Sequence, residues 1–266
     1  SRLGFVRAAS NIRVISAKRV ATRIMGLPLS AARSARAVAT AVLPKMTYGT
    51  AWSLPSRALS KALRTKVVSC VFGKASCIRC VEIVTGVMYD PVRLDPHFAA
   101  VFETLMRARR TLRKRDARQA RMRADLVSIA RGHGPQKRAP GPARGLIDAA
   151  EEISASVELR TNGVYIKFPQ GVVMPLLTSH STAFAEHVRE AARYTILEGL
   201  QQRVAASADP KKSRKDMRGI TPYVDRDATL QSLKLSKKDA TEEDAKLIQA
   251  VMRRILAGSI RTPHRL

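Results

Sequence analysis

The chain has few acidic residues for its length, and their distribution is uneven. Its 266 residues include 48 Lys and Arg but only 21 Asp and Glu, which gives a formal net charge of +27. No acidic residue precedes Glu82. A charge of this size opposes compaction by self-repulsion. Phosphate contacts that release counterions relieve it, so we expect a polyanion as partner, either nucleic acid or an anionic membrane.

Long apolar runs and aromatic residues are also scarce. No apolar run reaches the roughly 18 residues of a membrane-spanning helix, so we expect no membrane-embedded role. Aromatic residues make up 5% of the chain although hydrophobic residues make up 45%. The core must therefore rest on Ala, Val, Leu and Ile. The low aromatic content also speaks against an amphipathic helix lying on a membrane.

The three cysteines do not suggest a secreted disulfide framework, because their number is odd and they cluster at Cys70, Cys77 and Cys80. Cys77 and Cys80 have zinc-like spacing. A structural zinc site needs four ligands, however, and His97 is only a distant candidate for the fourth. Reduced thiols under apolar neighbours are the better interpretation, and we expect no metal.

Catalytic signatures are missing as well. The sequence has no Asp-Asp pair for a two-metal polymerase site, and no phosphate-binding loop, nucleophile elbow or zinc-protease motif. His180 and His187 lie seven residues apart, but a core or surface histidine is a better interpretation than a metal ligand. We therefore expect no enzyme, no cofactor and no small-molecule substrate.

The stretch from Phe98 to Arg131 is the most distinctive part of the sequence. It contains no Gly or Pro, and nine Lys/Arg lie between Arg107 and Arg123 with Asp116 as the only acid. Apolar residues follow a seven-residue repeat, which predicts one long helix with a narrow apolar edge. We expect that edge to pack on residues 56–88. Like charges four residues apart repel, so the Arg-rich face favours contact with nucleic acid over a solvated surface.

Further helices are expected before this stretch, over residues 11–26, 30–43, 56–72 and 81–90. Ser30 is a suitable N-cap, and we expect Pro44 to end its helix. The connector that follows contains Tyr48 and Trp52. These aromatic residues could stack on bases beside Lys45, but filling a small core is the favoured interpretation.

The second half begins with a Gly/Pro/Arg linker at residues 131–145. A short helix over 146–156 and a β-hairpin over 157–167 follow, because Asn162-Gly163 accepts the positive φ of a tight primed turn. A helix over 182–202, a basic linker over 207–219 and a final helix from Thr241 to Gly258 complete the chain. The predicted fold class is mainly α: a helical bundle with a long Arg-rich helix, basic extended linkers and a small second part that contains the hairpin. The expected parts are residues 1–130, a thumb-like basic helical domain; 131–145, the linker; 146–206, a small α+β part; and 207–266, a basic linker with a C-terminal helix.

Several short motifs carry a family resemblance. Leu27-Pro28-Leu29, an Ala/Arg helix and Val42-Leu43-Pro44-Lys45 with Tyr48-Gly49 resemble the segment after the palm in LINE-type (non-LTR) retrotransposon reverse transcriptases. In that family the segment belongs to the thumb, a helical bundle that grips the template–primer duplex. Leu63-Arg64, Cys80-Val81-Glu82-Ile83 and Asp95-Pro96 fit the same region. Residues 254–262 with Arg265-Leu266 resemble the helix and turn before the family's zinc cluster.

The same resemblance skips much of residues 131–240 and includes no catalytic motif. It implies that the palm with its catalytic aspartates would lie before Ser1 and the zinc cluster after Leu266. No catalytic residue is therefore carried over to this chain.

Three functions follow from these observations. The favoured one is a non-catalytic RNA-binding structural protein of a large ribonucleoprotein, ribosome-like and derived from a reverse-transcriptase-like element, with structured RNA and other ribonucleoprotein components as partners. The alternative is a fragment of an active LINE-type reverse transcriptase. The third is a DNA-compacting or membrane-surface protein. The candidate RNA-binding residues are Arg107, Arg109, Arg110, Arg113, Lys114, Arg118, Arg121, Arg123, Lys45, Arg57, Lys61, Arg64, Arg138, Arg144, Lys211, Lys212 and Arg214.

The composition of the first residues bears on location. Residues 1–41 are rich in Arg, Ala and Ser, which is the composition of a mitochondrial transit peptide. We therefore favour a mitochondrial location over a nuclear or cytoplasmic one. If the acid-free segment is retained, it is better interpreted as an RNA-contacting arm. Ser1 is compatible with a processed N-terminus and with the start of a fragment.

Overall fold

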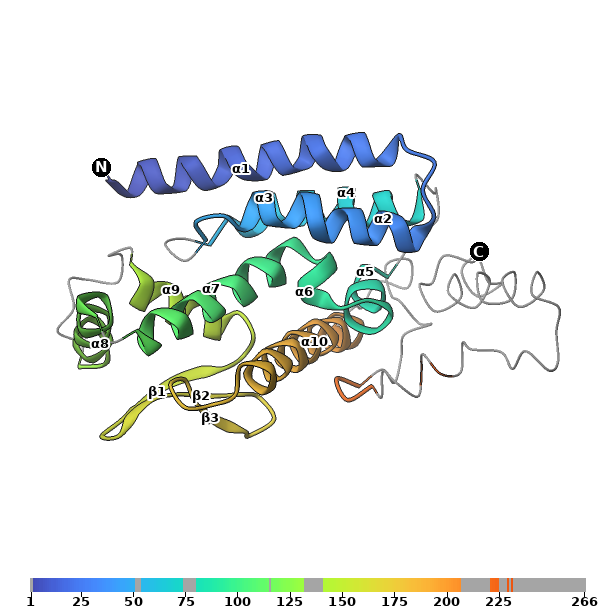
Figure 1. Cartoon of the computed structure of the whole chain (residues 1–266). Helices are drawn as coiled ribbons and strands as arrows, with labels where there is room; N and C mark the ends of the chain where they lie inside the picture. The colour runs from blue at the N-terminus through green and yellow to red at the C-terminus, as the bar shows by residue number, and fades with distance from the viewer. Residues whose placement is uncertain are drawn as a thin grey trace. The chain divides into compact units, whose positions relative to one another are not determined.

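A computed structural model describes residues 2–50, 54–73, 80–114, 116–131, 141–206, 221–224, 229 and 231, with side chains from residue 9 onward. The fold is mainly α with a small antiparallel sheet, as the sequence predicts (Figure 1). No helix in these ranges is long and apolar enough to cross a membrane. The elements are α1 (Arg2–Met25), α2 (Ala31–Ala37), η1 (Val38–Val42), α3 (Leu43–Thr47), α4 (Arg57–Phe72), α5 (Val81–Ile83), η2 (Val84–Met88), α6 (Pro91–Leu94), α7 (Pro96–Arg113), α8 (Ala117–Ala130), α9 (Pro142–Glu151), β1 (Ser156–Arg160), β2 (Gly163–Lys167), β3 (Val173–Pro175) and α10 (Ser181–Ala206).

Residue contacts divide the chain into two compact units. The first unit comprises Ser1–Gly73 and Pro91–Ala192, and the second comprises Lys74–Asp90 and Arg193–Leu266. Helix α9 and strand β1 pack with α7 and α8 inside the first unit. Segments before and after the expected linker at 131–145 thus belong to the same unit. The linker itself falls mostly outside the described residues.

In the first unit, α1 pairs with α4 through small side chains. Val14, Ala17, Ala21 and Ile24 are buried along one side of α1, at the three- and four-residue spacing of a single helix face. The two alanines allow close approach, and the Cys70 thiol of α4 donates to the Ala21 carbonyl oxygen at 3.0 Å. A core built from small aliphatic residues matches the low aromatic content.

Helix α7 lies at the centre of this unit. It packs against α3, α4, α6, α8 and α9, and Figure 1 shows these helices around it. The predicted apolar line is buried at Phe98, Val101, Leu105, Ala108 and Leu112. The expectation of a narrow apolar edge is wrong, however, because neighbours on several sides bury most of the helix circumference. Only its last turn carries exposed cations.

The expectation of one long helix over residues 98–131 is also wrong. Helix α7 ends at Arg113, and Lys114 is extended with φ −74° and ψ 128°. A new helix, α8, starts after Asp116, whose carboxylate accepts hydrogen bonds from the backbone amides of Arg118 and Gln119, both at 3.0 Å. The single acid in the basic run is therefore an N-cap, a role for which Asp is well suited. Because the Asp116 carboxylate caps the first amides of α8, it opposes continuation of α7 into α8.

Two proline positions behave differently. Pro96 follows the N-cap Asp95 at the start of α7 as the sequence predicts. Pro44 does not end its helix, because α2 continues through the π-helical turn η1 into α3, which contains Pro44. A proline inside a regular α-helix loses a hydrogen bond and clashes with the carbonyl four residues earlier. The wider turn over Val38–Val42 changes the hydrogen-bond spacing immediately before it.

The predicted hairpin forms, but its two-residue turn lies one residue earlier than the expected Asn162-Gly163 turn. Val157 pairs with Ile166 and Leu159 with Val164. The expected turn chemistry is wrong in detail: Thr161 and Asn162 form the turn, and Gly163, not Asn162, has positive φ. A third strand, β3, which the sequence analysis does not predict, pairs with β2.

Other boundaries shift by a few residues. Helix α9 begins at Pro142, not at residue 146, because Pro suits the first helical turn. Helix α10 confirms the expected helix over 182–202 and extends it at both ends. The basic linker at 207–219 and the helix from Thr241 lie outside the described residues.

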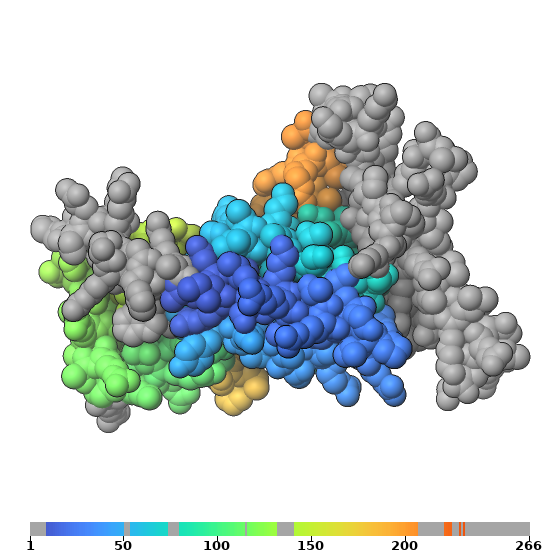
Figure 2. Space-filling view, turned by 90° about the horizontal axis from the view of Figure 1, so that it is seen from above, coloured from blue at the N-terminus to red at the C-terminus, as the bar shows by residue number. Residues whose placement is uncertain are grey.

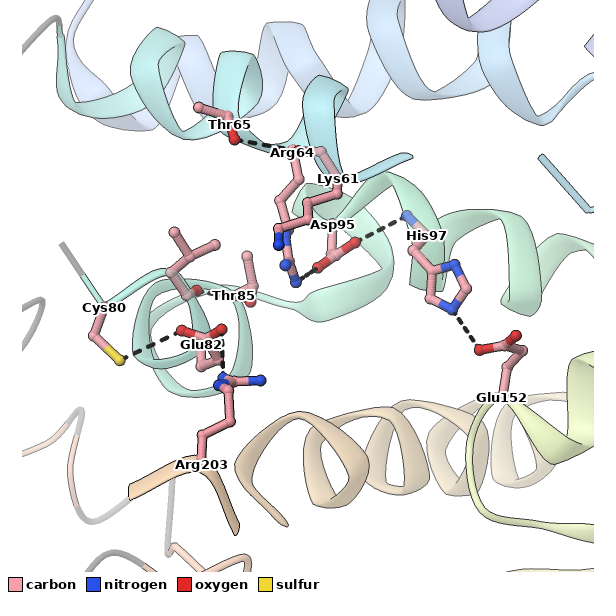
Figure 3. Close-up of polar contacts among 11 residues, drawn as sticks. Lys61, Arg64, Thr65, Cys80, Glu82, Thr85, Asp95, His97, Glu152 and Arg203 are labelled. Carbon is pink, nitrogen blue, oxygen red and sulfur yellow. Dashed lines mark hydrogen bonds and ion pairs between the residues drawn. The ribbon is translucent and has the colours of Figure 1, made fainter. Parts of the chain in front are cut away.

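The second unit contains α5, η2 and residues 193–206 of α10. Residues 84–88 of η2 are buried. A Cβ at Gly86 would lie 3.2 Å from Ile196 Cγ2, so glycine permits close packing there. Arg203 and Glu82 form an ion pair at 2.7 Å (Figure 3).

Candidate nucleic-acid interface

Ion pairs inside the first unit engage several of the candidate cations. Arg64 contacts the buried carboxylate of Asp95 at 3.2 Å, while the other Asp95 oxygen caps α7 by accepting from the His97 amide at 2.9 Å. The His97 ring lies 2.9 Å from Glu152 (Figure 3). Arg57 binds the same Glu152 with two nitrogens, at 2.6 and 3.1 Å. Arg57 and Arg64 thus connect α4 to α7 and α9.

Glu152 is the electrostatic centre of this network. Burial by itself raises the pKa of Glu152, but hydrogen bonds from His97 and Arg57, together with their charges, outweigh it and hold the pKa at about 2. The same contacts raise the pKa of Arg57. The side chain of Glu152 is 19% exposed and that of Arg57 is 78% exposed. The network therefore has a stabilising role, and the guanidinium of Arg57 is already neutralised.

Two more candidates pair within their own helices. Arg107 contacts Glu103 at 2.7 Å in α7, and Arg144 contacts Asp148 at 2.6 Å in α9. Both are four-residue pairs on a helix surface, which contribute only a few tenths of a kcal/mol, roughly. They can open toward another anion at little cost.

Arg109 does not face phosphate, which corrects the expectation from the sequence. It is 2% exposed, its guanidinium donates to the Ser179 carbonyl oxygen, and it lies over the Phe184 ring at 5.7 Å. Burial, followed by the charge of Arg113, lowers the pKa of Arg109. The carbonyl and the ring hold this cation inside the first unit, because α7 is surrounded there.

The remaining candidates of α7 and α8 form what we call the α7–α8 corner. Each is exposed and forms no ion pair or side-chain hydrogen bond within the part of the chain that the structure describes. Gln119 fixes the corner by donating its side-chain amide to the Leu112 carbonyl oxygen at 2.8 Å. The corner consists of Arg110, Arg113, Lys114, Arg118, Arg121 and Arg123.

The geometry of the corner concentrates positive charge. Arg110 and Arg113 occupy the last turn of α7, where the negative end of the helix dipole favours cations. Arg118 and Arg121 are three residues apart and share one face of α8. Met122 and Leu126 of α8 are buried, whereas Arg118, Arg121 and Arg123 are exposed. The corner can bind an extended anion through several separate phosphate contacts.

A second cationic region lies on the helices that precede Glu82. We call it the acid-free surface, and Figure 2 looks onto the α1 and α2 helices that form much of it. Lys45 and Lys61 are its exposed residues that are also among the candidates from the sequence without an ion pair in the described residues. The absence of acids up to residue 81, combined with the burial pattern of each helix, is the signal that could have identified the others. The acid-free surface includes exposed Lys18, Arg19, Arg23, Arg33, Arg36 and Lys45, and Lys61 is likewise exposed on α4.

Tyr48 does not fill a core. Its side chain is 68% exposed, so the favoured interpretation from the sequence is wrong for this residue. Trp52 lies outside the described residues, as do Arg138, Lys211, Lys212 and Arg214. Their contributions stay predictions.

Two of the three cysteines lie in the part of the chain that the structure describes. Cys70 and Cys80 are buried, and burial raises the pKa of Cys70. Among the described residues, no three His, Cys, Asp or Glu side chains are grouped to hold a metal ion. Cys77 is outside these residues.

Comparison of the chain with protein-family models, with curated proteins and with solved structures finds no match.

Proposed function

We propose that this protein is a non-catalytic RNA-binding protein that serves as a structural component of a large ribonucleoprotein. The observation that carries this proposal is the α7–α8 corner, where exposed cations lack carboxylate partners within the described residues. Elsewhere in the first unit the arginines of α4 are neutralised by Asp95 and Glu152. Positive charge left unpaired at a fixed corner suits a phosphate backbone.

The physical basis is counterion release. Each phosphate neutralised by Lys or Arg frees condensed cations, so affinity falls steeply with salt. Most phosphate contacts position a protein on nucleic acid without reading its sequence. The corner and the acid-free surface would together give an extended footprint for structured RNA. Such a footprint needs no catalytic group.

Two finer parts of the proposal rest on the sequence alone. The derivation from a LINE-type reverse transcriptase is a hypothesis supported by the thumb-like motifs, and the mitochondrial location is one supported by the Arg/Ala/Ser composition of residues 1–41. Protein partners within the particle are part of the same hypothesis.

The test measures binding of a stem–loop RNA between 50 and 500 mM salt. Each lost phosphate contact flattens the slope of log affinity against log salt by about 0.7–0.9. The double variant Arg118→Gln/Arg121→Gln should therefore flatten it by about 1.5. Adding Arg110→Gln and Arg113→Gln should bring the change to about 3, while circular dichroism stays that of the unmodified protein.

The matched control neutralises two cations of the sheet, Arg160→Gln/Lys167→Gln, and leaves the corner intact. It lowers the net charge equally and should change the slope by less than half as much. Equal weak binding at 50 and 500 mM salt would refute nucleic-acid binding. Preference for duplex DNA over the stem–loop in competition would replace RNA by DNA as the partner.

A further inference from the structure

The turn that follows α3 presents an aromatic ring beside an arginine from another helix. Tyr48 is the C-cap of α3, and the residue is 68% exposed. The guanidinium carbon of Arg13, in α1, lies 5.1 Å from the ring centroid. A cation at this distance over a tyrosine ring is attracted by the negative face of the ring. One face of Tyr48 is thus covered by Arg13.

This arrangement is fixed by the backbone. The Arg13 guanidinium donates to the Tyr48 carbonyl oxygen, which holds it at the turn. Gly49 has φ +79°, and a Cβ there would overlap with Arg13 Nη1 and lie 3.3 Å from its Cζ. Glycine is therefore needed twice, for the left-handed backbone and for the approach of Arg13.

The turn is also tied to α7. Thr50 is buried, and the Thr104 hydroxyl donates to the Thr50 carbonyl oxygen at 3.2 Å. Arg110 follows Thr104 by six residues, about 9 Å along the helix axis at 1.5 Å per residue. Lys45, exposed and without an ion pair in the described ranges, precedes Tyr48 by three residues. Arg13 is thus the cation that contacts the ring, and Lys45 is the nearest exposed cation along the chain.

We propose that Tyr48, with Arg13 beneath it, is a stacking platform for one unpaired base of the bound RNA. Every base has a π-face that can stack on an aromatic side chain, and proteins that recognise structured RNA take unpaired bases from loops and bulges. The exposed face of Tyr48 accepts the base, and Lys45 neutralises an adjacent phosphate. Positive surroundings without nearby acids on α1 to α4 favour RNA over a protein partner at this ring.

The platform rests on the proposed RNA-binding function and extends it from phosphate contact to base contact. It distinguishes two RNAs that carry the same number of phosphates: a stem–loop with unpaired nucleotides and a fully paired duplex. The stem–loop can place a base on Tyr48, whereas the bases of the duplex remain stacked on one another.

The test compares both RNAs, with 2-aminopurine in the loop as a fluorescent reporter of stacking. Tyr48→Ala should weaken stem–loop binding by about 5- to 150-fold, the range expected for one base–aromatic stack. It should change duplex binding by less than twofold and abolish the fluorescence change. Tyr48→Phe keeps the ring and should behave as the unmodified protein. Gly49→Ala should reduce the stem–loop preference by displacing Arg13.

The outcomes separate the two proposals. If both RNAs bind with a steep salt dependence and Tyr48→Ala binds them as the unmodified protein does, the platform is overturned and RNA binding stands. If neither RNA shows salt-dependent binding, the proposed function itself fails. A loss of duplex and stem–loop affinity by the same factor in Tyr48→Ala also overturns the platform, because it would mean a general contact.

Discussion

Replacing Glu152 with glutamine tests the ion-pair network that connects α4, α7 and α9. The substitution keeps the shape of the side chain and removes the charge that binds Arg57 and His97. Because the carboxylate is 19% exposed, little water would replace these partners. We expect the folded first unit to lose stability at neutral pH.

The magnitude follows from the pKa of Glu152, which is lowered from 4.5 to about 2. At about 1.4 kcal/mol for each unit of pKa shift, this corresponds to roughly 3 kcal/mol of folding stability. Arg57 is 78% exposed, so water screens part of its attraction, and we expect about 1–3 kcal/mol. The unfolded chain takes up the proton first as the pH falls. The contribution is therefore complete above about pH 5 and disappears as the pH falls from 4.5 to 2.

The assay is urea unfolding followed by circular dichroism at a series of pH values. Glu152→Gln should unfold at lower urea than the unmodified protein at pH 7, and the two curves should converge toward pH 2. Glu151→Gln is the matched control, since it removes the same charge from the exposed neighbouring residue. Equal stability of Glu152→Gln and the unmodified protein at pH 7 would refute the role of this network. A stability difference that stays constant down to pH 2 would refute it as well.

Two further predictions concern residues beside the α7–α8 corner, Asp116 and Arg109. Asp116→Ala should destabilise the protein by about 1 kcal/mol through loss of the α8 cap without weakening RNA binding, whereas Asp116→Asn should keep the cap. Unfolding and RNA titrations of both variants check this. If Asp116→Ala is as stable as the unmodified protein, the prediction is wrong. Arg109→Gln should cost about 1–3 kcal/mol of stability by leaving buried groups unpaired, while the salt slope of RNA binding stays unchanged. The neighbouring Arg110→Gln should flatten the salt slope and leave the stability unchanged. Identical behaviour of these two variants in unfolding and salt titrations would disprove the distinction.

Local signals predicted much of the fold. Ser30, Ser56 and Asp95 accept hydrogen bonds from backbone amides at the starts of their helices, because a short polar side chain before an apolar repeat satisfies amides within the next turn. The hairpin follows from two alternating runs on either side of turn residues, although its turn lies one residue earlier than predicted. Each of these features depends on residues close together in the sequence.

The candidate site was less predictable, because a list of cations does not reveal which of them find a carboxylate. Arg57 and Glu152 are 95 residues apart in the chain, and the packing of both α4 and α9 against α7 brings them together. Arg109 and Arg110 are indistinguishable as neighbours in a basic run. Their roles diverge because one points into the core and the other away from it.

Composition and periodicity are enough to predict the mainly helical class, the excess of positive charge and the buried repeat of α7. Composition and periodicity did not show that the basic run is split at Asp116, that its first part is the centre of the first unit, or that Tyr48 is exposed beside Arg13. The physical reason is that burial and pairing depend on neighbours distant in the chain. An arginine side chain is thus a core residue at position 109 and an exposed cation at the α7–α8 corner.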